Sequence, residues 1–185
     1  MIDEILKDAE AHMGKSVEAL RIDLRSVRTG RATPSLIEHL SIEYYGMPTP
    51  LLQIATIRAP EARLLTITPF SASDLSMIEK SILRSDLGLN PNNDGKIIRL
   101  AVPPLTEERR RDLVRQVQRR VEEARVSVRN IRRDAINDMR EAEKEKMVSE
   151  DELHRGMEEV QKVLDKTIEQ IEAVGRQKEA DIMEI

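Results

Sequence analysis

The fold is decided by residues 106–146, which read TEERRRDLVRQVQRRVEEARVSVRNIRRDAINDMREAEKEK. Apolar residues recur there at steps of three and four, and this spacing predicts one long helix with a single apolar stripe. Thr106 is the expected N-cap of this helix, which would form a rod of roughly 58 Å at 1.5 Å per residue. The expected stripe consists of Val114, Val117, Val121, Ala124, Val128, Ile131, Ala135 and Ala142.

Two further helices are predicted on either side of this rod. Residues 2–28 carry the same spacing, and Gly30 and Pro34 end the pattern. Ser149, followed three residues later by Glu152, forms a capping-box pattern that opens the last helix. Its expected stripe is Leu153, Met157, Val160, Leu164, Ile168, Ile171 and Val174.

None of the three helices could bury its stripe alone, so the three stripes must share one core. Because the turn near Val148 is short, the last two helices are expected to be antiparallel, in an elongated three-helix bundle. The alternative that this pattern leaves open is an isolated coiled coil or a helical adaptor.

Residues 31–104 have a different pattern and interrupt the bundle after its first helix. Short β-rich runs such as QIATIRA and RLLTITPF surround one helical segment, in which Ser73 is the expected N-cap and Leu83 an expected core residue. The predicted fold class is therefore α+β, with residues 1–30 and 105–185 as the bundle and 31–104 as an inserted small α/β domain. The connections RTGRATP and VPPLT favour a pivot between the domains, although a rigidly fused domain is also compatible with the sequence.

The composition argues against an enzyme and against a membrane protein. Of 185 residues 35% are charged and only 2% aromatic, with no cysteine for a disulfide or a thiolate metal site. His12, His39 and His154 lie in separate elements, and no phosphate-binding loop or nucleophile motif is present. No apolar run is long enough to span a bilayer. We therefore expect a cytoplasmic, non-enzymatic protein without cofactor or metal.

Charge is distributed unevenly along the chain. The net charge is −4, yet residues 125–140 carry five arginines and only two acidic residues, Asp134 and Asp138. Guanidinium groups suit phosphate, and phosphate contacts dominate affinity for nucleic acids. The arginines Arg125, Arg129, Arg132, Arg133 and Arg140 are expected to line one solvent-exposed face. A merely solvated face, partly neutralised by neighbouring carboxylates, is the alternative, and the scarcity of aromatics argues against base stacking.

Three separated motifs resemble the bacterial ribosome recycling factor family. They are VRTGRATPSLIEHLSIEYYG at 27–46, NPNNDGKIIRLAVPPLTEERR at 90–110 and RNIRRDAINDM at 129–139. The resemblance covers essentially the whole chain in the same order. It implies an L-shaped molecule similar in outline to transfer RNA, with a bundle and a small domain joined by a two-stranded hinge.

The resemblance also implies the function and its residues. Family members bind the post-termination ribosome as monomers and, with elongation factor G and GTP, split it into subunits, so that messenger RNA and deacylated transfer RNA leave. The arginines implied to contact large-subunit ribosomal RNA are Arg129 and Arg132, with Arg133 and Arg125 beside them. The implied hinge consists of Thr29, Gly30 and Arg31 on one side and Pro103, Pro104 and Leu105 on the other.

Two other functions are compatible with the same residue pattern. A structural adaptor would hold two protein partners and use the acidic last helix as a docking face. A general double-stranded RNA binder would bind any A-form helix through its phosphates.

Overall fold

The computed structural model describes residues 1–184 and contains two compact units. The first unit comprises Met1–Thr29 together with the chain from Thr106 onward, and the second comprises Gly30–Leu105. Each unit buries aliphatic residues of its own.

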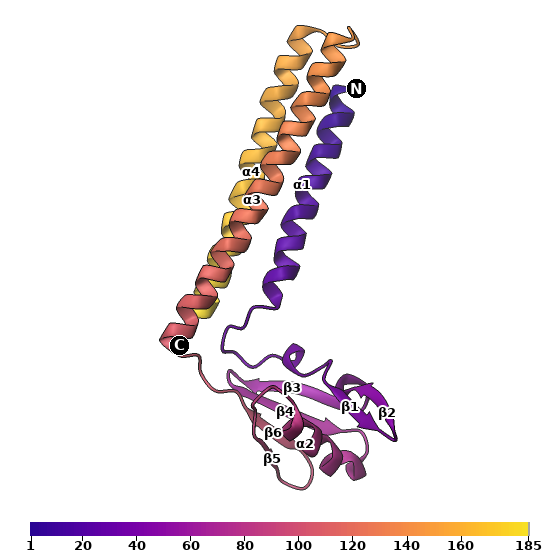
Figure 1. Ribbon diagram of the computed structural model, residues 1–185, viewed down its shortest axis with the longest axis vertical. Helices are drawn as coiled ribbons and strands as arrows, with labels where there is room; N and C mark the ends of the chain where they lie inside the picture. Colours follow the sequence, from indigo (N-terminus) through magenta and orange to yellow (C-terminus); the bar gives the residue numbers. More distant parts are fainter. Residues whose placement is uncertain (185) are drawn as a thin grey trace. The chain divides into compact units, whose positions relative to one another are not determined.

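The first unit is a bundle of three long helices (Figure 1). They are α1 (Ile2–Arg25), α3 (Glu107–Lys144) and α4 (Glu150–Met183). Each helix contacts both of the others, and α4 runs antiparallel to α3 after a turn of a few residues. The predicted three-helix bundle is confirmed.

The two helix caps predicted for the bundle, at Thr106 and Ser149, form as expected. The Thr106 side chain accepts a hydrogen bond from the backbone N–H of Arg109 at 3.1 Å. At the start of α4 the Ser149 hydroxyl accepts from the N–H of Glu152, whose carboxylate in turn accepts from the Ser149 N–H at 2.7 Å. This hydrogen bond to the charged form lowers the pKa of Glu152. The capping box therefore fixes where α4 begins.

The bundle core differs from the expected stripes at several positions. In α3, Leu113 is buried while Val114 is only partly covered. Ile136 and Met139 are also buried, although the sequence analysis did not include them. In α4, the expected core residues Met157, Ile168 and Val174 are half-buried, and their places at the centre are taken by Gly156, Thr167 and Gly175.

The second unit contains two antiparallel sheets and one helix. A hairpin joins β1 (Ser41–Tyr44) to β2 (Met47–Pro50). The larger sheet has the order β3-β4-β6-β5. Its strands are β3 (Ala55–Glu61), β4 (Leu64–Pro69), β5 (Pro91–Asn93) and β6 (Ile98–Ala101), and the helix is α2 (Leu75–Arg84). Short 3-10 turns cover Pro34–Leu36, Leu51–Gln53 and Ala72–Asp74.

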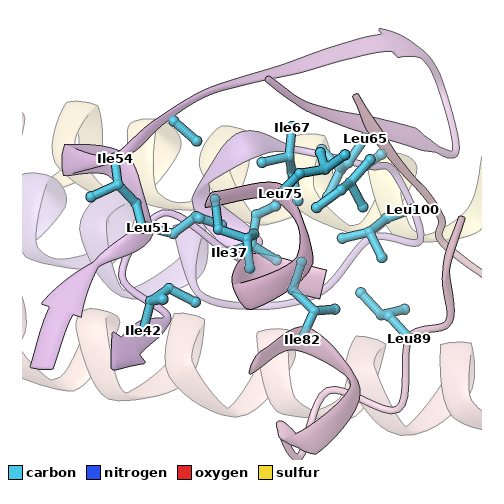
Figure 2. Packing of buried hydrophobic residues seen from close by; sticks show 14 of the residues in the cluster. Ile37, Ile42, Leu51, Ile54, Leu65, Ile67, Leu75, Ile82, Leu89 and Leu100 are labelled. Carbon is cyan, nitrogen blue, oxygen red and sulfur yellow. The ribbon is translucent and has the colours of Figure 1, made fainter. Parts of the chain in front are cut away.

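Aliphatic side chains from the strands and α2 form the core of this unit (Figure 2). Ile67 and Leu100 come from neighbouring strands of the larger sheet, and Ile78 and Ile82 come from α2. All four side chains are fully buried. Together with the bundle this unit confirms the α+β fold class.

Two local predictions for the small unit are wrong, and one strand was not predicted. Ser73 does not cap α2, because a 3-10 turn precedes the helix and Asp74 occupies the N-cap position without a side-chain cap bond. Leu83 is exposed, since the buried side of α2 follows Leu75, Ile78 and Ile82. Strand β2 was not expected at all: its sequence, MPTP, contains two prolines, and prolines are tolerated only in edge strands such as this one.

The turn before β6 is organised by two side chains. Asn93 accepts a hydrogen bond from the N–H of Gly95, while Asp94 accepts from the N–H groups of Lys96 and Ile97 and pairs with Arg99 at 2.7 Å. The bonds from Ile97, Lys96 and Arg99 stabilise the charged carboxylate and lower the pKa of Asp94 to about 2.

Asp94→Asn should therefore reduce stability in a pH-dependent way. A carboxylate whose folded-state pKa lies below its ordinary value of 3.8 stabilises the fold above that value. This contribution is lost as the pH falls towards about 2. Urea unfolding should show the variant less stable at neutral pH, with the difference narrowing only below about pH 4. Asp86→Asn, at an exposed carboxylate of the same unit, is the control; a difference that did not narrow would contradict the charge effect.

Candidate nucleic-acid interface

The five arginines Arg125, Arg129, Arg132, Arg133 and Arg140 lie on one broad face of α3, within roughly 100° of arc, but they differ in exposure. Arg129, Arg133 and Arg140 are exposed, whereas Arg125 and Arg132 are half-buried. The latter two are separated by seven residues, nearly two helical turns. Arg125 pairs with Glu172 of α4, and Arg132 lines a groove together with residues of α4. The expectation that all five side chains are solvent-exposed is therefore wrong for Arg125 and Arg132.

Arg125 is held within the bundle by two carboxylates. Its guanidinium lies 2.8 Å from Glu122 and 3.4 Å from Glu172 of α4, and only 28% of the side chain is exposed. The hydrogen bond with Glu122 is the main cause that raises the pKa of Arg125. A guanidinium with two carboxylate partners is less available for phosphate, so Arg125 chiefly ties α3 to α4.

Arg132 lies at a groove between α3 and α4. The groove has a volume of about 470 Å³ and is lined, besides Arg132, by His154, Met157, Glu158, Gln161 and Lys162. The Nε atom of Arg132 is buried and has no hydrogen-bond partner. A buried donor without a partner costs free energy, so this guanidinium would gain from an acceptor.

Arg129 and Arg133 make only weak contacts with neighbouring carboxylates. Arg129 lies 3.7 Å from Glu122, and Arg133 lies 3.8 Å from Asp134 with 67% of its side chain exposed. Exposed pairs of this kind contribute about 0–1 kcal/mol, so a phosphate can displace them at little cost.

The same side of α3 carries three further exposed arginines that the sequence analysis did not single out, namely Arg111, Arg115 and Arg119. Arg115 and Arg119 precede Arg129 and Arg133 by 14 residues each, close to four helical turns, and all four side chains are exposed. The signal was available in the sequence, because residues 107–140 carry 11 arginines and only seven carboxylates.

The expected hinge residues lie where the chain passes between the two units. Thr29 ends the first segment of the bundle, and Gly30 and Leu105 are the first and last residues of the small unit. Gly30 has φ +81°, and a Cβ atom placed on it would lie 3.4 Å from the Cγ of Leu105. The two connections therefore run close together at these residues.

His12 and His154 have local partners, and residues 1–184 contain no candidate metal cluster. Nδ1 of His12 contacts the carbonyl oxygen of Asp8 at 2.6 Å, and His154 lies 3.7 Å from Glu150. Within the described chain no group of three His, Cys, Asp or Glu residues could hold a metal ion. Nor is any of its helices both long and apolar enough to cross a membrane.

Comparison with known proteins identifies the family. A family model described as ribosome recycling factor matches residues 20–183. The chain belongs to the ribosome recycling factor family. The ribosome-recycling factor of Chloroflexus aurantiacus is 54% identical, and that of Syntrophomonas wolfei is 51% identical, each over the full length of both chains.

Solved structures of this family share the fold. A solution structure of a ribosome recycling factor is 42% identical to this chain and has a TM-score of 0.73. The alignment covers 100% of this chain and 98% of the other. A second structure, at 45% identity and a TM-score of 0.62, is matched in full. It is described as the T. thermophilus ribosome recycling factor and the E. coli elongation factor G bound to the E. coli post-termination complex. The resemblance inferred from three motifs is confirmed, and the family is one of translation factors.

Proposed function

We propose that this chain recycles ribosomes: it binds the post-termination ribosome and, with elongation factor G and GTP, separates the subunits. Messenger RNA and deacylated transfer RNA would leave in this step. The observation that carries the proposal is the 45% identity, over both entire chains, to a ribosome recycling factor placed with elongation factor G on a post-termination complex.

Ribosomal RNA would be bound by α3 through its arginines. Arg129 and Arg133 expose guanidinium groups with weak local partners, and Arg132 adds a buried donor without a partner. Planar guanidinium groups bind phosphate in a bidentate manner, which suits a backbone of fixed shape. Arg125 contributes indirectly, because its ion pairs hold α4 against α3.

The chain would act without bond chemistry of its own. The GTP would be bound and hydrolysed by the translocase, and the recycling factor would work as a monomer without cofactor or metal. Its place of action would be the cytoplasm, where post-termination ribosomes form.

Light scattering tests this function directly. Post-termination ribosomes are mixed with the protein, elongation factor G and GTP, and each component is omitted in turn. A loss of scattering that requires all of them is the expected result. If scattering does not change while a known recycling factor splits the same ribosomes with the same translocase, the proposed function is wrong. A general RNA binder would instead be identified if unrelated duplex RNA competed with the ribosome for the protein.

We further propose that the two connections act as a hinge. Thr29, Gly30 and Arg31 would form one strand of it, and Pro103, Pro104 and Leu105 the other. Gly30 supports this role because φ +81° is a conformation that most residues avoid, so the chain keeps an unusual backbone at the boundary between the units. Two short connections would allow rotation while limiting translation.

Gly30→Pro should slow subunit splitting while leaving ribosome binding within about twofold. Proline fixes φ near −65°, so it cannot adopt the Gly30 backbone and would change how the first connection bends. Stopped-flow light scattering gives the splitting rate, which we expect to fall about tenfold. Such a decrease corresponds to a rise of about 1.4 kcal/mol in the activation free energy of splitting. Gly88→Pro is the matched control, because Gly88 also has a positive φ but has open space around it. Unchanged splitting in Gly30→Pro would rule out a hinge role for this residue.

A further inference from the structure

The two connections of the small unit are fastened to a single turn within that unit. Ala32 lies at the end of the first connection, and its N–H donates to the carbonyl oxygen of Ala62 at 2.7 Å. Val102 lies at the start of the second connection, and its N–H donates to the carbonyl oxygen of Arg63 at 2.9 Å. Ala62 and Arg63 are consecutive residues between β3 and β4, and we call them the β3–β4 turn. The chain that enters the unit and the chain that leaves it are therefore held next to each other.

Packing holds the same two places. Ala32 and Val102 are 6% and 7% exposed and belong to the hydrophobic core of the small unit. A buried N–H that loses its partner costs free energy, so this packing depends on both hydrogen bonds. The β3–β4 turn itself is exposed and contributes only backbone carbonyl oxygens to the two bonds. Its role therefore depends on the shape of its backbone rather than on its side chains.

That backbone shape is not the one that a two-residue hairpin loop usually adopts. Glu61 pairs with Leu64, so Ala62 and Arg63 form a loop of two residues. Such loops prefer type I′ or II′ turns, which need a positive φ at the first loop residue. Neither Ala62 nor Arg63 has a positive φ. The turn thus departs from the geometry that strand pairing alone would favour.

A β-bulge bends β3 just before the turn. The register of β3 against β4 shifts between Arg58 and Glu61. In this interval Ala59 and Pro60 of β3 lie opposite a single residue of β4, Leu65. A bulge increases the local twist and redirects the strand, and proline is tolerated there because it has no N–H to donate to the ladder. Together, the bulge and the turn place two carbonyl oxygens within hydrogen-bonding distance of both connections.

We propose that the β3–β4 turn is a clamp that positions both connections of the hinge during subunit splitting. The proposal rests on the proposed function and deepens its hinge. Because neighbouring residues hold the two connections, neither connection can slide along the small unit, and any rotation of that unit must move both together. Beyond the clamp, Gly30 lets the first connection bend, whereas Pro103 and Pro104 keep the second one stiff. Ala62 and Arg63 are therefore positioning residues that act through their backbone.

Ester substitution tests the clamp, because it removes one N–H donor and leaves every side chain in place. Cell-free synthesis with α-hydroxy acids gives the full-length chain with lactic acid in place of Ala32, or with 2-hydroxyisovaleric acid in place of Val102. The matched control carries 2-hydroxyisocaproic acid in place of Leu51. Leu51 is likewise buried in the small unit, and its N–H donates to the carbonyl oxygen of Leu40 at 2.9 Å, but it belongs to neither connection.

The three esters should differ in subunit splitting but not in stability. Each removes one buried hydrogen bond, so each should lower the melting temperature by a similar amount, about 4–8 °C. Splitting with elongation factor G and GTP should slow about fivefold for the Ala32 and Val102 esters, and less than about twofold for the Leu51 ester. Ribosome binding should stay within about twofold for all three. A merely structural role of the two bonds would instead affect splitting equally in the three esters.

Hydrogen exchange measured by NMR gives a second test, on the unchanged chain. The amides of Ala32 and Val102 should exchange as slowly as that of Leu51, since a buried, hydrogen-bonded amide exchanges only when the structure around it opens. Rapid exchange at either amide, or equal splitting by all three esters, would overturn the proposal. Splitting by the unchanged chain would then still support the proposed function. No splitting by the unchanged chain would reject that function and, with it, the role of the clamp.

Discussion

Arg132→Ala should weaken ribosome binding by about tenfold or more, the largest functional effect that we expect from a single arginine. Arg132 already has a buried Nε without a partner, so its desolvation cost is partly met before it binds. Arg129 and Arg133 are instead more than half exposed, so solvent screens their contacts with phosphate and reduces the net gain from each. Alanine at either of these positions should therefore cost less affinity than alanine at Arg132.

The salt dependence of binding shows whether a phosphate contact was lost. Titrations of vacant ribosomes between about 50 and 200 mM salt give the slope of log affinity against log salt concentration. Loss of one phosphate contact should reduce that slope by about 1. Arg125→Ala is the matched control on the same helix, since its guanidinium is occupied by Glu122 and Glu172, and its affinity should stay within about twofold. If Arg132→Ala and Arg125→Ala behaved alike, the distinction between the paired guanidinium of Arg125 and the unpaired Nε of Arg132 would be wrong.

The helices could be predicted well from the sequence because their signals are local. The hydroxyls of Thr106 and Ser149 cap helices from within one turn of the residues they bond. The apolar spacing that defines α1 is equally local: Ala9, Met13, Val17, Leu20 and Leu24 are buried as the periodicity predicts. Such features depend on neighbours three or four residues away, so a single sequence carries them.

The small unit was harder to predict because its details depend on tertiary context. The two prolines of β2 argue against a strand, and only its position at the edge of a two-stranded sheet makes them acceptable. Leu83 follows the helical period, yet the core lies on the other side of α2 and leaves it in solvent. Neither outcome can be derived from spacing alone.

In the candidate site, too, some features are local and visible in the sequence, whereas others depend on tertiary packing. The abundance of arginine in α3 is visible in the sequence, but the pairing of Arg125 with Glu172 joins residues 47 positions apart. The groove beside Arg132 likewise depends on residues of α4. Which arginines are free for a ligand therefore follows from the packing of two helices and could not be predicted from α3 by itself.

Glycine in the bundle core was overlooked because pattern analysis searches for large apolar residues. Gly175 is buried, and a Cβ atom placed on it would lie 2.7 Å from the Cγ2 of Val121. Gly156 is similarly close to Met139, at 2.9 Å from its Sδ. At both positions the missing side chain lets α3 approach α4 closely, so glycine acts here as a packing residue.

Gly175→Ala should lower the free energy of unfolding by about 1–2 kcal/mol. Overpacking a core costs about 1–3 kcal/mol, and the better helix propensity of alanine returns up to about 1 kcal/mol of it. Gly14→Ala is the control that isolates helix propensity, because Gly14 is exposed in α1 and a Cβ atom added to it would have nothing within 4 Å. The free energy of unfolding of this variant should rise by about 1 kcal/mol. Gly156→Ala should cost less than Gly175→Ala, since its closest neighbour, Met139, is flexible, and the other, Ile2 at 3.0 Å, is the first residue of α1.

A double-mutant cycle with Val121→Ala identifies the contact responsible. Val121 has little freedom to avoid the new methyl group, because it is β-branched and only 6% exposed. Removing its methyl groups creates space that alanine at position 175 can fill, so the two changes together should cost at least about 1 kcal/mol less than their sum. Urea unfolding of the four proteins measures this coupling. Additive effects would mean that α4 moves away from α3 as a whole, and the close approach at Gly175 would then not be fixed by Val121.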